Sequence, residues 1–188
     1  MEFRTFEVGG PIEIRPRKVE DQRGYFSEIF RLNAFTDYAP GTEFVQDNQS
    51  LSIRAGTVRG LHFQTRPAAQ GKLVRCLAGR LIDVAVDLRK GSPTFSRWIS
   101  VTLSSEQCNQ LWVPVGFGHG FCTLEPNTVI SYRVTDYYSA ENDKGLAWDD
   151  PDIGIEWPAI ADPETLSAKD RSQPSLAKLP AYFTMDDK

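Results

Sequence analysis

The sequence predicts an all-β fold: a sandwich, a barrel or a jelly roll. Residues 82–87 and 129–136 alternate apolar with polar side chains, which is the period of a strand with one buried face. Fourteen glycines and twelve prolines separate the short runs of this kind, as in folds of many strands joined by turns. Many short antiparallel strands are typical of all three architectures, and periodicity alone does not choose among them.

The remaining elements follow from similar local patterns. Further strands are expected over residues 3–8, 44–53, 72–77, 98–103 and 111–115. Gly79-Arg80 lies between two strands and indicates a tight hairpin. A helix of two turns is expected over residues 31–38, because Pro40-Gly41 would stop it. From about residue 159 the chain mixes prolines with polar residues, so we expect this segment to wrap over the barrel with a short helix or two.

Length and composition bound the class of protein. A chain of 188 residues can bury its own core, and we expect a single domain over residues 1–188. With 40% apolar and 24% charged residues, the composition indicates a globular protein and not a disordered or fibrous one. The formal charge is -4, and neither sign forms a long block. A nucleic-acid partner is therefore not expected.

The ends and the cysteines indicate the compartment. Charged residues interrupt the first seven positions, where a signal peptide would need an apolar run, and no run approaches the ~20 apolar residues of a membrane span. Cys76, Cys108 and Cys122 are an odd number at wide spacing. We therefore expect free thiols instead of a disulfide framework or a zinc site, a cytoplasmic location and no membrane partner.

Three groups of segments carry a resemblance to a known family. The first is DQRGYFSE at residues 21–28. The second contains FVQDNQS at 44–50, GTVRGLHFQ at 56–64 and QGKLVR at 70–75. The third contains LWVP at 111–114, GFGHGF at 116–121, YRVTDYY at 132–138 and WDDP at 148–151. As an ordered set from about residue 3 to about residue 170, they resemble the dTDP-4-dehydrorhamnose 3,5-epimerase family.

This resemblance implies a cupin-type jelly roll with a few short helices, and a homodimer. The pattern Pro-x-Gly-x-x-His at 114–119 also resembles half of the general cupin signature. The other half would supply a His-x-His pair and a Glu for a metal, but this chain has His62-Phe63-Gln64 there. His62 and His119 are the only histidines, and two nitrogen ligands make a poor transition-metal site. We expect no metal and no cupin oxygenase activity.

The chemistry of that family explains which residues are needed. Epimerising the carbons beside a ketone requires a base of near-neutral pKa, a donor for the enolate oxygen, and an acid on the opposite face. His62 matches the family's base, and its ordinary pKa is about 6.5. Asp170 matches the aspartate that orients it. Tyr132 matches the proton donor, and Lys72 matches the lysine near the keto oxygen.

Each of these four residues also has a structural alternative. A histidine or tyrosine in a strand is often only a hydrogen-bonded core residue. Asp170 could be a solvated carboxylate, and Lys72 could extend its ammonium group to the rim of the barrel. The joint match, not any single identity, favours the catalytic interpretation.

The resemblance also implies a set of substrate contacts. Arginine side chains suit diphosphate oxygens, and the aromatic ring of Tyr138 matches one that stacks on thymine. His119 is expected to donate to the ketone or the sugar. The full set is Arg23, Phe26, Glu28, Gln46, Asp47, Asn48, Arg59, Lys72, His119, Tyr138, Asp143 and Lys169. Asp143 departs from a glutamate common in the family, so its reach is shorter. No glycine-rich phosphate loop is present, and no cofactor is expected.

Three functions follow as candidates. The leading one is an isomerase that epimerises dTDP-4-dehydro-6-deoxy-D-glucose at C3 and C5, giving dTDP-4-dehydro-L-rhamnose for dTDP-L-rhamnose biosynthesis. The first alternative is a single-carbon epimerase of another dTDP-deoxysugar pathway. The second is a non-catalytic cupin that binds a nucleotide sugar, since the barrel hosts many functions.

Overall fold

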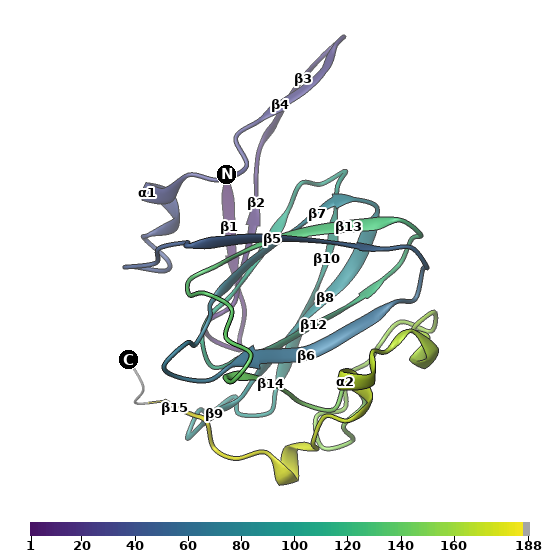
Figure 1. Cartoon of the computed structure of the whole chain (residues 1–188). Helices are drawn as coiled ribbons and strands as arrows, with labels where there is room; N and C mark the ends of the chain where they lie inside the picture. The colour runs from purple at the N-terminus through teal and green to yellow at the C-terminus, as the bar shows by residue number, and fades with distance from the viewer. Residues whose placement is uncertain (186–188) are drawn as a thin grey trace.

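Two antiparallel sheets face each other in this computed structural model, which describes residues 1–185 (Figure 1). The first contains, in order, β1 (Glu2–Thr5), β2 (Ile12–Arg15), β11 (Gln110–Val113), β7 (Lys72–Ala78), β13 (Thr128–Val134) and β5 (Gln46–Ser52). The second contains β10 (Trp98–Ser104), β8 (Arg80–Asp87), β12 (Phe117–Thr123), β6 (Val58–Gln64) and β14 (Asp143–Gly145). The prediction of an all-β jelly roll is confirmed.

An apolar core fills part of the space between the two sheets. Val74, Leu103 and Ile130 belong to this buried cluster, each from a different strand. Along β7, the inward positions read Lys72, Val74 and Cys76, so an apolar row ends in a charged residue. The Lys72 end of this row borders a cavity.

The outer face of the five-stranded sheet is covered as well. The C-terminal segment contains η1 (Pro163–Thr165), α2 (Ala168–Arg171), η2 (Leu176–Lys178) and β15 (Phe183–Thr184), which pairs in parallel with β9 (Arg89–Lys90). Leu61, Val84 and Phe183 meet in a second buried cluster on this face. The short helices expected after residue 159 are present and lie beside this sheet (Figure 1). The boundaries of one domain stay a prediction.

Two central strands, β6 and β12, were not predicted by periodicity. Every residue of β12 is buried, because one face meets the core and the other lies under the C-terminal segment, so alternation is lost. The two strands also approach closely: Gly60 has a φ of 128°, and a Cβ there would lie 2.6 Å from Gly120 Cα. Their register shifts between His119 and Phe121, and such irregularities often re-aim side chains beside active sites.

The single helix before the barrel covers the outer face of the six-stranded sheet. α1 (Leu32–Phe35) lies within the predicted residues 31–38. Its Phe35 is fully buried and packs edge-on against Trp112 of β11, at a ring distance of 5.3 Å. No helix within residues 1–185 is long and apolar enough to cross a membrane.

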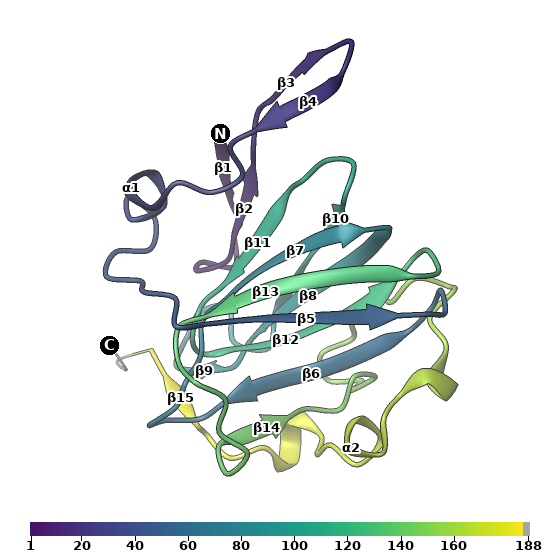
Figure 2. The same ribbon diagram turned by 45° about the horizontal axis from the view of Figure 1, so that its top comes forward.

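A hairpin that was not predicted projects from the barrel. β3 (Lys18–Asp21) and β4 (Gly24–Ser27) extend away from both sheets (Figure 1 and Figure 2). Near its turn, Tyr25 Oη lies 3.3 Å from Sγ of Cys108 in the turn after β10. Phe26 is 74% exposed, and Val19 is exposed beside it. This hairpin therefore presents apolar surface that its own barrel does not cover.

Candidate active site

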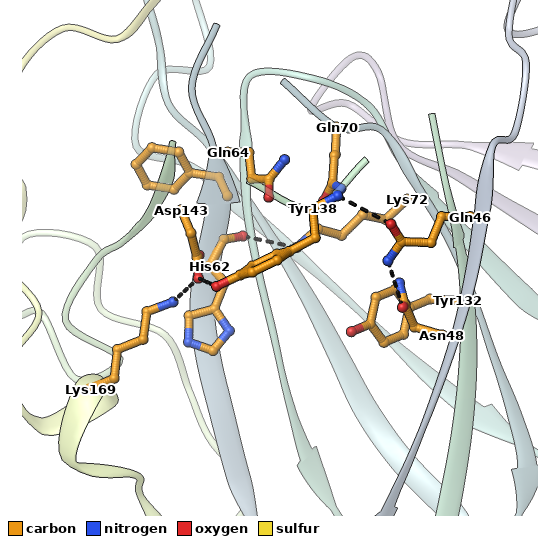
Figure 3. A pocket seen from close by; sticks show the side chains of 11 residues that line it. Gln46, Asn48, His62, Gln64, Gln70, Lys72, Tyr132, Tyr138, Asp143 and Lys169 are labelled. Carbon is orange, nitrogen blue, oxygen red and sulfur yellow. Dashed lines mark hydrogen bonds and ion pairs between the residues drawn. The ribbon is translucent and has the colours of Figure 1, made fainter. Parts of the chain in front are cut away.

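A polar cavity opens between the sheets (Figure 3). Its volume is about 290 Å³, and its walls come from both sheets, the loop after β13 and α2. It is lined by Gln46, Asn48, His62, Phe63, Gln64, Gln70, Lys72, Tyr132, Tyr138, Asp143 and Lys169. A chamber of about 200 Å³ adjoins it, lined by Ser50, Arg59, His62, Lys72, His119, Phe121, Ile130 and Tyr132. His62, Lys72 and Tyr132 border both spaces, so they stand at the junction.

His62 and Asp170 form a hydrogen-bonded pair. Nε2 of His62, on β6, lies 2.5 Å from Oδ1 of Asp170, on α2. Ser167 Oγ donates to the other carboxylate oxygen at 2.8 Å. Burial raises the pKa of Asp170, but the hydrogen bond and charge of His62 and the hydrogen bonds of Ser167 outweigh it, so the pKa lies below its ordinary value. With Nε2 held, Nδ1 is the ring atom left to exchange a proton with a ligand.

Tyr132 stands across the cavity from His62 (Figure 3). It projects from β13 of the six-stranded sheet, whereas His62 belongs to the five-stranded sheet. Burial raises the pKa of the Tyr132 phenol, and Asp143 raises it further, against a lowering by Arg59. The phenol is therefore protonated near neutral pH and can act as a proton donor.

Lys72 brings an ammonium group to the same space. Its Nζ donates to the His62 carbonyl oxygen at 3.3 Å. Burial lowers the pKa of Lys72 to about 8, although the negative charges of Asp143 and Asp83 act in the opposite direction. The group is thus still mostly cationic at neutral pH, and it can stabilise negative charge that develops on an oxygen in the cavity.

A second histidine–carboxylate pair lies deeper in the barrel. His119 Nε2 of β12 is 2.7 Å from Asp83 Oδ1 of β8, and both side chains are buried. His119 was expected from the sequence, but Asp83 was not. The alternation over residues 82–87 could have found it, because it places Asp83 on the face opposite Ile82 and Val84. That face proved to be the inner one.

The mouth of the cavity is lined by a polar group of side chains. Tyr138 Oη donates to Asp143 Oδ2 at 3.2 Å, and Lys169 Nζ donates to the same oxygen at 2.5 Å. On the opposite side, Gln46 Nε2 donates to Asn48 Oδ1 at 2.8 Å (Figure 3). All five residues were expected at the substrate from the sequence, and the structure brings them to one opening.

Four expected substrate contacts lie elsewhere. Arg23 and Phe26 are on the projecting hairpin, where Arg23 pairs with Asp21 at 2.6 Å. Glu28 follows the hairpin and pairs with Arg31 at 2.8 Å. The side chain of Asp47 points to the outer face of the sheet, since neighbours in a strand alternate, and it accepts from Ser131 Oγ at 2.8 Å. These residues do not line the cavity of their own chain.

Arg59 lies at the rim of the inner chamber, where its Nη2 donates to the Leu51 carbonyl oxygen at 3.1 Å. Its guanidinium also lowers the pKa of Tyr132, after the larger effect of burial. No three His, Cys, Asp or Glu side chains of the described chain are grouped so that they could hold a metal ion. The site therefore offers a base, a phenol on the facing wall and a cation, which suits proton transfer on two faces of a ligand.

Comparison with known proteins identifies the family. The sequence model described as dTDP-4-dehydrorhamnose 3,5-epimerase matches residues 5–178. The chain belongs to this family. The resemblance drawn from the motifs is thus confirmed. A curated relative from Sinorhizobium fredii, named dTDP-4-dehydrorhamnose 3,5-epimerase, is 58% identical over 183 residues, which cover 97% of this chain and 93% of the relative.

Solved structures of relatives share the fold. The epimerase from Legionella pneumophila in complex with dTDP-4-keto-L-rhamnose is 37% identical, with a TM-score of 0.90 and 97% of each chain covered. A 3′-monoepimerase from Streptomyces bikiniensis in complex with dTDP-quinovose is 32% identical, with a TM-score of 0.85 over 92% of this chain and 87% of that one. The prediction of a cupin-type jelly roll is confirmed.

Proposed function

We propose that the protein is an isomerase that epimerises dTDP-4-dehydro-6-deoxy-D-glucose at C3 and C5, giving dTDP-4-dehydro-L-rhamnose for dTDP-L-rhamnose biosynthesis. One observation carries this proposal: His62 and Tyr132 face one cavity from opposite sheets, with Lys72 beside them. Inversion at carbon needs a proton removed from one face and another delivered to the opposite face. Two proton-transfer groups on facing walls meet that need.

The reaction follows from the positions of these groups. His62 removes the proton from a carbon beside the ketone, and the electron pair of that C–H bond moves onto the keto oxygen as an enolate. The Lys72 ammonium stabilises this oxygen, while Asp170 stabilises the imidazolium of His62. Tyr132 then gives its proton to the opposite face of the carbon. His62 then releases its extra proton to water and Tyr132 regains one from water, so both groups return to their starting states. The sugar repeats these steps at the second carbon, and no electron acceptor is needed.

The mouth of the cavity supports binding of the nucleotide. Tyr138 offers an aromatic face for the thymine, and the amides of Gln46 and Asn48 offer donors and acceptors for its polar edge. The cations of Arg59 and Lys169 suit the diphosphate, and His119 reaches the sugar from the inner chamber. Asp143 holds Lys169 in place until a ligand arrives.

The projecting hairpin supports a homodimer in which each chain completes the cavity of its partner. Arg23 and Phe26 match substrate-contact positions, yet the hairpin that carries them extends away from its own barrel (Figure 2). Its apolar side chains are left exposed. A second copy related by a two-fold axis would bury this surface and bring the hairpin to a cavity. For Asp47 and Glu28, only the resemblance to the family supports a contact with the substrate.

We place the protein in the cytoplasm. Its three cysteines are free, and burial raises the pKa of the Cys76 and Cys122 thiols to about 11. Such thiols are poorly reactive and are stable in a reducing compartment.

The proposal is tested by incubating the protein with dTDP-4-dehydro-6-deoxy-D-glucose in heavy water and following C3 and C5 by NMR. Deuterium at both carbons, with inverted product trapped by a reductase, is the expected result. Label at one carbon would favour the single-carbon epimerase. Absence of label together with tight dTDP binding would favour the non-catalytic cupin. A His62→Asn variant is the control, since it should lose exchange but retain nucleotide binding.

A further inference from the structure

Gln64 makes three hydrogen bonds to the backbone around the cavity mouth. Its Nε2 donates to the Ala68 carbonyl oxygen at 2.6 Å and to the Tyr137 carbonyl oxygen at 3.1 Å. Its Oε1 accepts from the Ser139 amide at 2.8 Å. The residue is only 4% exposed, so these backbone groups take the place of water as hydrogen-bond partners of its Nε2 and Oε1 atoms. One side chain thus joins β6 to the loop that precedes β14.

Two other glutamines hold the same loop from different sides. Gln46 Oε1 accepts from the Tyr138 amide at 3.1 Å, and Gln70 Nε2 donates to the Asp136 carbonyl oxygen at 2.7 Å. Four consecutive residues, 136–139, are therefore fixed through their backbones by carboxamides from β5, β6 and the segment before β7. Gln64 makes two of the four bonds, and it is the one that holds both sides of Tyr138.

This clamp leaves the side chain of Tyr138 free to face a ligand. Tyr138 is 61% exposed, and its side chain lies over the cavity mouth, where its hydroxyl reaches Asp143 (Figure 3). An exposed aromatic on a mobile loop would lose backbone and side-chain entropy when it stacks on a ligand. A loop whose backbone is already fixed avoids the backbone part of that loss, so its ring binds more tightly.

We propose that Gln64 is a positioning residue for nucleotide binding, which fixes the 136–139 backbone so that Tyr138 is pre-organised against the base. This inference rests on the proposed function, because it assigns Tyr138 to the nucleotide. The position requires one planar group with a donor and an acceptor at a fixed spacing. A glutamate would set an anion against two carbonyl oxygens, and a methionine would leave three backbone groups without their partner.

The test compares Gln64→Met with wild type and with Gln107→Met, which alters an exposed glutamine in the turn between β10 and β11. Titration calorimetry gives the dissociation constant for dTDP, and a coupled assay gives kcat and KM for the nucleotide sugar. We expect Gln64→Met to raise both the dissociation constant and KM about tenfold, since the two lost hydrogen bonds to the backbone of residues 137 and 139 are worth about that factor. We expect kcat to fall less, because His62, Lys72 and Tyr132 are untouched. Gln107→Met should match wild type.

A second variant covers the case in which Gln64→Met does not fold. Gln64→Glu retains the acceptor for the Ser139 amide, and its carboxyl group regains a donor when it is protonated. The dTDP dissociation constant of this variant, divided by that of wild type, should therefore fall toward one as the pH is lowered from about 8 to about 5. Hydrogen exchange of the Tyr138 and Ser139 amides should be faster than in wild type at the higher pH.

Three outcomes separate this inference from the proposed function on which it rests. A wild type that binds dTDP and turns over, with unchanged dissociation constant and KM in the Gln64 variants, would overturn the role of Gln64 alone. A loss of kcat at unchanged KM would also overturn it. A wild type that neither binds dTDP nor turns over would overturn the proposed function, and the role of Gln64 with it.

Discussion

His62 and Asp170 meet at 2.5 Å although 108 residues separate them in the chain. The contact joins a strand of the barrel to α2 of the C-terminal segment, and Ser167 at the helix N-cap holds both the backbone and the carboxylate of Asp170. The C-terminal segment therefore does more than cover the outer face of a sheet. It supplies the group that orients the proposed base.

Replacing Asp170 by Asn is expected to reduce kcat by about 100-fold or more, because the amide cannot stabilise the imidazolium and favours the wrong tautomer. Initial rates in the coupled assay measure the loss. dTDP affinity should stay within about twofold of wild type. Ser167→Ala serves as the milder comparison, since it removes one hydrogen bond and leaves the carboxylate. A kcat near that of wild type in Asp170→Asn would rule out this role.

Replacing Tyr132 by Phe is expected to separate proton exchange from inversion. His62 can still remove a proton and return it to the same face, so deuterium from heavy water enters the substrate with its configuration retained. Delivery to the opposite face is lost with the phenol. NMR of the recovered nucleotide sugar measures both events. Inverted product at the wild-type rate would show that another group supplies the second proton.

The proposed catalytic residues could be predicted only from the ordered set of motifs, and not from local sequence patterns. His62, Lys72, Tyr132 and Asp170 come from segments far apart in the sequence, and no periodicity connects them. Only the resemblance to a family predicted that they share a site. In the structure His62, Lys72 and Tyr132 line one cavity, and Asp170 hydrogen-bonds His62. Their roles stay predictions, because position alone does not measure a proton transfer.

Periodicity missed the barrel strands β6 and β12 for one reason. Alternation indicates a buried face only when the other face meets water, and the five-stranded sheet is covered on both sides. In β8, Ile82 and Val84 face the C-terminal segment, while Asp83 and Ala85 face the barrel interior, so the polar residue lies inside. The role of Gln64 was missed likewise, because a backbone clamp has no signature in the sequence.

The charge state of Lys72 is expected to set the alkaline limit of activity. A lysine is cationic below its pKa, and burial lowers that of Lys72 to about 8, so kcat/KM should fall above pH 8 as the ammonium loses its proton. Steady-state kinetics across the pH range measures the limb. In a Lys72→Arg variant the fall of kcat/KM above pH 8 should disappear, because a guanidinium keeps its proton in this range. The value of kcat/KM should be lower at every pH, because the guanidinium fits the space differently. An unshifted limb in that variant would assign it to another group.

The same shift predicts a change in stability. The unfolded chain holds the Lys72 proton up to its ordinary pKa of 10.5, whereas the folded chain releases it near 8. Between these values the unfolded state binds more protons, so this group makes the free energy of unfolding rise with pH. Lys72→Met should remove this contribution, and the difference between the two denaturation curves measured from pH 8 to pH 10 isolates it.

Glu13 is expected to be a stabilising carboxylate at neutral pH. It is fully buried on β2, where it accepts from Arg15 Nε at 2.9 Å and from Asn109 Nδ2 at 3.0 Å. Burial raises its pKa, but these hydrogen bonds and the arginine charges outweigh it, so the pKa lies below the ordinary 4.5. The stabilisation is therefore complete above pH 4.5 and is lost as the pH falls through the lowered value.

Glu13→Gln should accordingly reduce the free energy of unfolding by about 2 kcal/mol at pH 7. The loss is limited because the partner arginines are half-exposed, so water can solvate their guanidinium groups when the carboxylate charge is removed. Chemical denaturation at pH 7 and pH 3 measures the difference, which should shrink at the lower pH. Glu2→Gln, at an exposed position of β1, should change little at either pH.

The proposal that each hairpin completes the partner's cavity can be tested with mixed dimers of two inactive variants. We combine a chain carrying Arg23→Ala and Phe26→Ala, whose hairpin is impaired, with a His62→Asn chain, whose base is absent. If each hairpin serves the partner's cavity, the mixed dimer has one intact site, built from the barrel of the first chain and the hairpin of the second. If each hairpin serves its own barrel, the mixed dimer has none.

Each variant alone should therefore be nearly inactive, and co-refolding the two in equal amounts should restore about a quarter of the wild-type activity. Random pairing makes half of the dimers mixed, and each mixed dimer holds one working site of two. Sedimentation at several concentrations checks that dimers form, and tagged chains allow the mixed species to be isolated. Failure to recover activity in an isolated mixed dimer would place each hairpin with its own barrel, and a monomeric wild type would exclude the exchange altogether.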